Sequence, residues 1–127
     1  MITKKIGRRD PRFEYERKIK ISYGESGELL FIWRGKSAKE LQEFSVSFRT
    51  EFNGRWYTVR RHCWTLHQDK FHTHVRVGFG KRRFIKIYPP PLKASIQRAL
   101  NWAKKDMEAN WYIYLQKFNK LVINRKD

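Results

Sequence analysis

Acidic residues are nearly absent from the middle of this 127-residue chain. From Phe52 to Lys105 the only acid is Asp69, while the same stretch holds thirteen Lys or Arg and all four His. The whole chain has a formal net charge of +17 at pH 7. Such charge repels itself in a compact fold, and a phosphate backbone that releases counterions on binding relieves the repulsion. The charge therefore favours nucleic acid as a partner, and it also suits high solubility or an acidic protein partner.

Cysteine is limited to Cys63, which excludes a disulfide within the chain and a Cys-based zinc knuckle. Its scarcity favours a reducing, intracellular setting. No apolar run approaches the roughly 20 residues of a membrane span, and the basic start of the chain has no signal-peptide core. We expect a cytoplasmic protein that makes no membrane contact.

Several signatures of enzymes are also missing. The segment Gly78-Phe79-Gly80-Lys81 lacks the spacing and the hydroxyl residue of a phosphate-binding loop. Asp69 has no second carboxylate close in sequence, which argues against a two-metal nuclease. Cys63 is predicted to point into the core, which argues against a thiol nucleophile. No metal and no cofactor are predicted.

Hydrophobic residues make up 40% and aromatic residues 16% of the sequence, enough for one packed core. We expect one domain over 1–127, in which 1–15 is a flexible basic arm and 16–88 alternates with period two, as strands do. After Pro89-Pro90-Pro91, apolar residues at three- and four-residue steps predict a long helix over 91–122. The fold class is α+β: a twisted antiparallel sheet of five or six strands, with the helix packed on one face.

The Asn53-Gly54 pair predicts a two-residue hairpin turn, which sets the register of the flanking strands. Taken literally, this turn pairs Phe48 with Val59, Val46 with Arg61 and Phe44 with Cys63 on the inner face. An open outer face would then combine cations with aromatic rings, a mixture suited to the phosphates and stacked bases of single-stranded nucleic acid. The basic hairpin tip at 81–83 is expected to contact phosphates as well. The predicted nucleic-acid-binding residues are Arg49, Trp56, Arg60, His62, Trp64, Arg76, Lys81, Arg82 and Arg83.

The histidines supply the only candidate chemistry. His72 and His74 are two residues apart and so project from one side of a strand, with His62 and Arg60 expected opposite them. A metal-independent ribonuclease needs two imidazoles for proton transfer and a cation to stabilise the phosphorane. Its catalytic residues would be His67, His72, His74 and Lys70. Two alternatives remain open: His67, His72 and His74 as zinc ligands, at a spacing that matches no strong signature, and histidines that only bind RNA.

The predicted helix has a second, partly apolar side. Arg98, Trp102 and Lys105 lie opposite the apolar stripe, and Ala109 and Ile113 follow further along. Such a side is expected to contact the N-terminal hairpin, a second subunit or a stacked base. A homodimer through the Trp102 face is one of these expectations.

The segment Trp56-Tyr57-Thr58-Val59-Arg60-Arg61, followed by His67, His72 and His74, resembles a group of small uncharacterised prokaryotic and archaeal proteins. Their pattern is an aromatic-rich strand with Arg, a short His-containing loop and a strand similar to His-x-His, and the resemblance covers residues 44–79. Those proteins usually carry an Asp after the Arg and a His-Gly pair in the loop, which this chain lacks. The resemblance implies no established function, and by analogy suggests toxin or defence modules.

Three functions follow from the sequence. The first is a non-catalytic module that binds nucleic acid, with RNA slightly preferred to DNA because sheet platforms read unpaired bases more often than duplex grooves. The second is a small ribonuclease of toxin type that uses His with Lys or Arg. The third is an interaction protein whose basic face docks an acidic protein partner.

Overall fold

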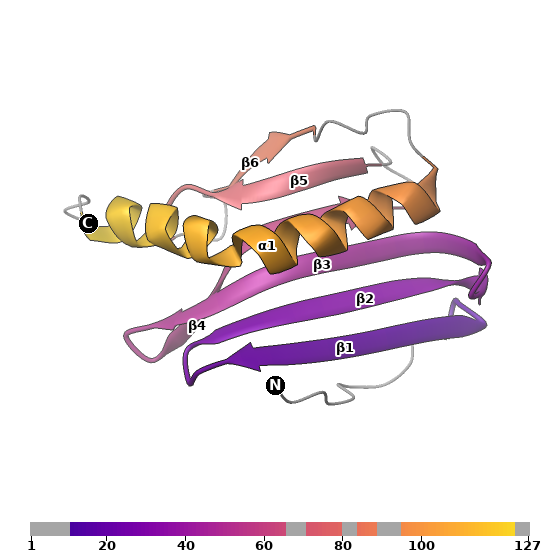
Figure 1. Ribbon diagram of the computed structural model, residues 1–127, viewed down its shortest axis with the longest axis horizontal. Coiled ribbons are helices and arrows are strands. Elements are labelled where there is room, and N and C mark those ends of the chain that lie inside the picture. Colours follow the sequence, from indigo (N-terminus) through magenta and orange to yellow (C-terminus); the bar gives the residue numbers. More distant parts are fainter. Residues whose placement is uncertain (1–10, 66–70, 80–83, 89–94, 124–127) are drawn as a thin grey trace.

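A computed structural model describes residues 11–65, 71–79, 84–88 and 95–123 of the chain (Figure 1). The predicted hairpin tip at 81–83 and the residues His67 and Lys70 lie outside this part. The elements are β1 (Tyr15–Tyr23), β2 (Gly27–Ser37), β3 (Glu40–Phe52), β4 (Arg55–Trp64), β5 (Phe71–Arg76), β6 (Phe84–Ile87) and α1 (Ile96–Ile123).

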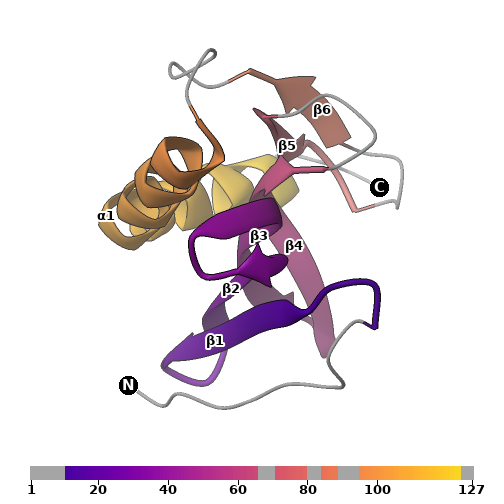
Figure 2. The same ribbon diagram turned by 90° about the vertical axis from the view of Figure 1, so that its right-hand side faces the viewer.

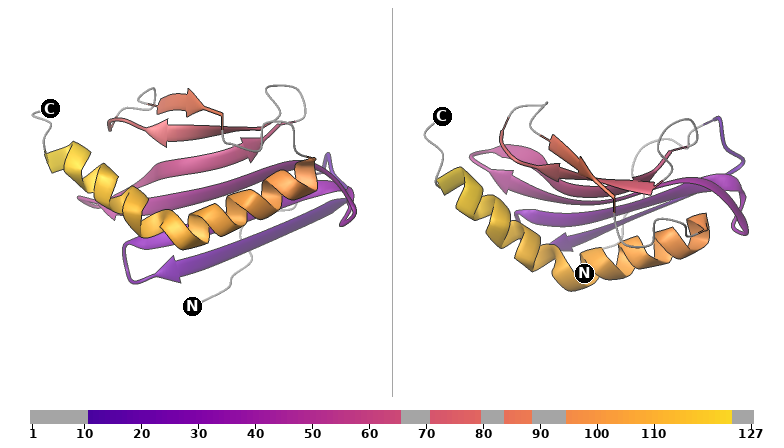
Figure 3. Two further views of the ribbon diagram at one scale, coloured as in Figure 1. Left: turned by 45° about the horizontal axis from the view of Figure 1, so that its top comes forward. Right: turned by 90° about the horizontal axis from the view of Figure 1, so that it is seen from above.

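The strands form one antiparallel sheet in sequence order, β1-β2-β3-β4-β5-β6. The helix α1 crosses one face of this sheet, as Figures 2 and 3 show, and within the described residues no helix covers the other. We call the face under α1 the inner face and the opposite one the outer face. The predicted α+β class, with a long C-terminal helix on an antiparallel sheet, is confirmed.

The core lies between the inner face and α1. Alternate residues of β2 and β3, among them Leu29, Phe31 and Phe48, are 2% exposed or less. On the helix, Ala99 and Ala103 are fully buried, and their small side chains let the helix backbone approach the sheet closely. Burial of this apolar surface supplies the main favourable term in the folding free energy.

The helix begins at Ile96 rather than at the predicted residue 91. Ser95 is its N-cap: the Ser95 hydroxyl accepts a hydrogen bond from the backbone N–H of Arg98 at 3.3 Å, and the Ser95 carbonyl accepts one from Ala99 at 2.9 Å. A Ser at this position satisfies backbone donors that the first turn leaves unpaired. Residues 89–94, including Pro91, fall outside the described part.

The Asn53-Gly54 turn forms as predicted, with φ of 52° and 78°. Near it the predicted register holds, since Phe52 pairs with Arg55 and Arg49 with Thr58. Beyond Arg49 the register shifts by one residue, because Val59 is an extra residue in β4, a β-bulge. Phe48 therefore pairs with Arg60, Val46 with His62 and Phe44 with Trp64.

The bulge corrects the predicted outer face of β4. Because side chains alternate along a strand, one extra residue moves every later side chain to the opposite face. Arg60, His62 and Trp64 consequently lie on the inner face, and Arg61 and Cys63 lie on the outer one. Cys63 is buried, as expected, but on the side of the sheet away from α1.

Two further features of the described residues bear on the predictions. Phe13, inside the predicted flexible arm, is buried, and the Arg34 guanidinium lies 6.0 Å from the centre of its ring. Trp102 packs against His62 and Phe71, so it does not belong to an exposed second side of the helix. In the described part of the chain, no helix is long and apolar enough to span a membrane.

Gly35 permits a tight irregularity of β2. A Cβ atom at this position would lie 2.1 Å from the Glu40 carbonyl oxygen and 2.6 Å from the Leu41 Cα atom, so the backbone would have to move. We expect Gly35→Ala to lower the free energy of unfolding by about 3 kcal/mol in urea denaturation. The control is Gly54→Ala, which adds no clash within 4 Å and costs about 1 kcal/mol of backbone strain. An equal loss in both variants would contradict this account of Gly35.

Candidate functional site

The pairing of β4 with β5 places polar side chains on both faces of the sheet. His62 pairs with Thr73, and both lie on the inner face, fully buried under α1. The neighbouring pair, Cys63 and His72, lies on the outer face. The two faces therefore carry two separate polar groups within the same pair of strands.

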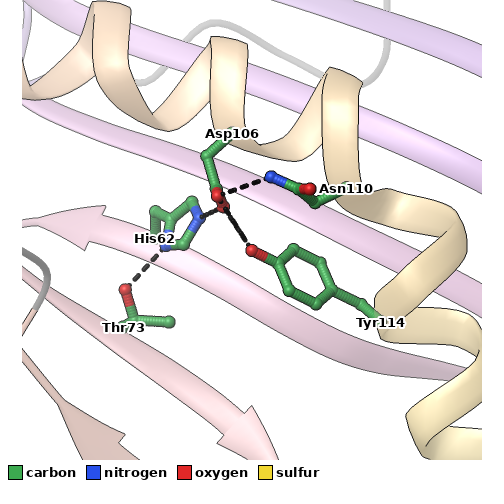
Figure 4. Close-up of polar contacts among 5 residues, drawn as sticks. All are labelled: His62, Thr73, Asp106, Asn110 and Tyr114. Carbon is green, nitrogen blue, oxygen red and sulfur yellow. Dashed lines mark hydrogen bonds and ion pairs between the residues drawn. The ribbon is translucent and has the colours of Figure 1, made fainter.

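The inner polar network joins the sheet to the helix (Figure 4). His62 Nδ1 lies 2.6 Å from the Thr73 hydroxyl oxygen, and His62 Nε2 lies 2.7 Å from Asp106 Oδ2. Asp106 also accepts hydrogen bonds from Tyr114 at 2.7 Å and from Asn110 at 3.0 Å. Asp106, Asn110 and Tyr114 follow one another at four-residue steps on α1, which places them on one side of the helix.

The protonation states in this network follow from burial. Desolvation lowers the pKa of His62 and outweighs the hydrogen bond to Asp106, so the ring is neutral near pH 7. The His62 Nε2–H then donates to the carboxylate, and the Thr73 hydroxyl donates to Nδ1. For Asp106, burial alone would raise the pKa, but the hydrogen bonds from His62, Tyr114 and Asn110 together lower it, so this group carries the negative charge.

An acid, an imidazole and a hydroxyl in a row are also the parts of a hydrolase triad. Here the hydroxyl of Thr73 and the ring of His62 are fully buried, so no substrate can reach them. Arg60 covers the far end of the network, with its guanidinium 4.1 Å from the centre of the Tyr114 ring. The inner polar network therefore holds α1 against the sheet.

The outer face of β4 and β5 carries the outer cluster, formed by Cys63, His72 and His74. One ligand-type atom from each residue lies within 4.8 Å of the other two. The cluster forms part of the wall of a hollow of about 340 Å³, which we call the outer hollow. Its charged or ligand-type lining residues are Arg34, Glu43, Arg61, Cys63, His72 and His74.

Burial, and then nearby cations, set the protonation of the outer cluster. Desolvation, and then the positive charge of Arg61, lower the pKa of His74 to about 4, so this imidazole is neutral at pH 7. Burial raises the pKa of the Cys63 thiol, while Arg61, which hydrogen bonds to the sulfur, acts against this rise. The cluster thus offers a neutral imidazole and a thiol beside a guanidinium.

The predicted cluster of His62, His72 and His74 with Arg60 does not form. His72 and His74 share the outer face, with ring centroids 4.8 Å apart, but His62 and Arg60 lie on the other side of the sheet. Of the predicted nucleic-acid-binding residues, Trp64 lies on the inner face, where it is partly buried against the core and stacks on Phe71, so it is not part of the open outer face.

Two predicted contact residues lie on the outer face, and a third is held by the backbone. The guanidinium of Arg49 lies 5.4 Å from the centre of the Trp56 ring, which is 38% exposed. Arg76 donates hydrogen bonds to the carbonyls of Thr58 at 2.6 Å and Gly78 at 3.0 Å. Its guanidinium is therefore committed to the fold.

Sequence reasoning missed the partners of both polar groups. Asp106, 44 residues from His62, was not considered, although Asp106, Asn110 and Tyr114 form a polar row beside the apolar stripe of the helix that would have signalled a buried contact. Arg61 and Cys63 were assigned to the inner face, because the bulge at Val59 has no marker in the sequence.

Comparison with protein families identifies residues 14–122 with a family described as a domain of unknown function (DUF7718). The match covers most of the 127 residues, and the chain belongs to this family. No curated protein and no solved structure matches the chain.

Asp106→Asn tests the inner polar network. Both oxygens of a carboxylate accept hydrogen bonds, whereas an Asn side chain has one accepting oxygen and one donating NH₂ group. In Asp106→Asn the NH₂ group would therefore face a side chain that also donates. Because a buried donor without a partner costs about 1–3 kcal/mol, we expect the free energy of unfolding in urea to fall by about 2 kcal/mol. Glu108→Gln, an exposed position on the same helix, is the matched control and should change nothing. Equal stability of the two variants would show that the network holds nothing together.

The same proteins give a pH test. The pKa of Asp106 is lower in the folded chain than the ordinary 3.8. A lowered carboxyl pKa contributes stability above the unfolded value, and this contribution is lost as pH falls through the folded value. The stability difference between wild type and Asp106→Asn should therefore be greatest above a pH of about 4 and shrink below it. A difference that stays constant into the acid range would contradict the charge assigned to Asp106.

Proposed function

We propose that this chain binds nucleic acid, with single-stranded RNA preferred, on the outer face of β4, β5 and β6. The observation that carries the proposal is the separation of charge across the sheet. Strands β4, β5 and β6 contain no Asp or Glu, and of their five Lys or Arg the exposed pair on the outer face is Arg61 and Lys86. A phosphate backbone is the ligand that such a surface attracts, because its binding releases counterions.

The charges of β1, β2 and β3 are arranged differently, since Lys18, Lys20, Arg34 and Arg49 are paired with carboxylates on the outer face. Lys20 lies 3.0 Å from a Glu28 oxygen, and Arg49 lies 2.8 Å from the other oxygen of the same Glu28. Lys18 and Arg34 both contact Glu16. This half of the face is a network of ion pairs, which leaves the excess of positive charge over β4, β5 and β6.

The charged half of the face also offers stacking surfaces. Trp56 is partly exposed beside Arg49, and the His74 ring meets Phe84 edge-on at 6.2 Å. Stacking of a base on such a ring is worth about 1–3 kcal/mol and tolerates any base. Arg61 and Lys86 are exposed and pair with His74 from the strands on either side of β5, which places both cations beside this ring as phosphate contacts. They replace Arg60, His62 and Trp64 in the interface proposed from the sequence.

A ribonuclease of toxin type is the second candidate, favoured by the adjacent rings of His72 and His74 beside Arg61. Its mechanism needs one protonated and one neutral imidazole. His74, with a pKa of about 4, can act as a base but holds almost no proton at pH 7. His72 is 2% exposed and so is poorly placed to meet a substrate hydroxyl. Binding without cleavage is thus the better supported function.

Charge removal on one face tests the binding proposal. We expect the double change Arg61→Ser and Lys86→Ser to weaken binding of a labelled RNA of about 16 nucleotides at least tenfold. The slope of log K against log [salt] should fall by about 0.7 for each phosphate that the variant no longer neutralises. The matched control is Lys105→Ser with Lys120→Ser, which removes the same charge from exposed positions on α1. Fluorescence anisotropy at several salt concentrations measures both quantities.

Three outcomes would count against the proposal or refine it. Equal weakening in the two double variants would mean that net charge, and no particular face, attracts the RNA. Absence of binding, together with binding of an acidic polypeptide, would favour the interaction protein instead. Shortened RNA after incubation with EDTA would establish the ribonuclease, whereas intact RNA with retarded mobility is the expected result.

A further inference from the structure

The outer cluster has the composition and placement of a metal site. Cys63 pairs directly with His72 across β4 and β5, so the two side chains leave the sheet side by side. His74 is two residues further along the same strand and therefore points the same way. Strand pairing alone thus brings one sulfur and two imidazoles to the wall of the outer hollow.

We propose that Cys63, His72 and His74 bind a divalent metal ion of the zinc class. Thiolate sulfur and imidazole nitrogen are the ligands that zinc prefers, whereas magnesium and calcium require oxygen. The proposal does not depend on nucleic-acid binding. It also departs from the zinc alternative considered from the sequence, which used His67 with His72 and His74.

The separations fit such an ion after a small adjustment. With Zn–S near 2.3 Å and Zn–N near 2.1 Å, the ligand atoms of a tetrahedral site lie about 3.4–3.6 Å apart. The three atoms of the outer cluster are all within 4.8 Å of one another. A contraction of about 1 Å is within reach of side-chain rotation, because the strands already hold the three Cβ atoms together.

The charges around the cluster are mixed. Arg61 and Lys86 are close enough to lower the pKa of His74, and they would also repel a cation. Glu43 lies on the wall of the same hollow, where its carboxylate is 3.7 Å from the Arg34 guanidinium, and loss of the Cys63 proton on binding adds a negative charge at the ion itself.

Three protein ligands leave one coordination position open. In zinc sites this position holds water or a ligand oxygen, and here it would face the outer hollow. The Thr65 hydroxyl lines that hollow, is buried and has no hydrogen-bond partner among the described residues. An ordered water on the metal is a partner suited to this hydroxyl.

Cobalt is the probe for the first experiment, because a thiolate bound to Co²⁺ gives a charge-transfer band that oxygen and nitrogen ligands do not. Protein freed of metal with EDTA and then titrated with Co²⁺ should show this band and saturate at one ion per chain. An equivalent of Zn²⁺ should then remove the band, since zinc binds such sites more tightly than cobalt.

Single replacements identify the ligands. Cys63→Ser should abolish the charge-transfer band, and His74→Ala should raise the Kd for Zn²⁺ at least about tenfold, since losing even an outer-shell partner costs 10–100-fold. His67→Ala is the matched control and should bind as wild type does. Circular dichroism and thermal melting of each variant show whether it is folded, and His74, which is only partly buried, is the position least needed for folding.

Two results would overturn the proposal. One is wild-type protein that shows no saturable Co²⁺ band and no zinc retained after gel filtration. The other is loss of zinc binding in His67→Ala with zinc binding retained in Cys63→Ser, which would assign the site to His67, His72 and His74 instead.

Discussion

The extra residue at Val59 decides what this molecule presents on each face of its sheet. Without the bulge, continuation of the Asn53-Gly54 register would turn His62 outward and Cys63 toward the helix. With it, His62 comes under α1 and hydrogen bonds to Asp106, while Cys63 joins His72 and His74 outside. The buried bond and the outer cluster thus depend on one local irregularity of β4.

The two faces then serve different purposes. On the inner face a half-buried carboxylate accepts hydrogen bonds from three side chains and ties the helix to the sheet. Full burial of its partner His62 fits a role in stability. On the outer face, charge, aromatic rings and metal-ligand types lie around the outer hollow. Loops and open faces supported by a rigid scaffold are where proteins place binding residues, and the outer face of β4, β5 and β6 follows that pattern.

Local patterns in the sequence predicted the elements well. Period-two alternation marked the strands, three- and four-residue steps marked the helix, and Asn53-Gly54 formed the expected turn. These features depend on neighbouring residues, which a sequence displays directly. The predicted helix start at residue 91 is wrong because Ser95 caps the helix, which therefore begins at Ile96.

Long-range features were beyond the same reasoning. No residue pattern around Val59 marks the bulge, so the predicted outer face is wrong for Arg60, His62 and Trp64. His62 and Asp106 meet across 44 positions, and Cys63 meets His72 only through strand pairing. Such contacts follow from packing of the whole chain rather than from residue type or spacing.

The central claim, that the outer face of β4, β5 and β6 is the binding surface for nucleic acid, can be tested in one measurement. Amide resonances of isotope-labelled protein, recorded by NMR during titration with a short single-stranded RNA, report contacts along the whole backbone. We expect the largest shifts on Arg61, His74 and Lys86 and no change on the exposed side of α1. Shifts confined to α1 or to β1 and β2, or no shifts at all, would contradict it.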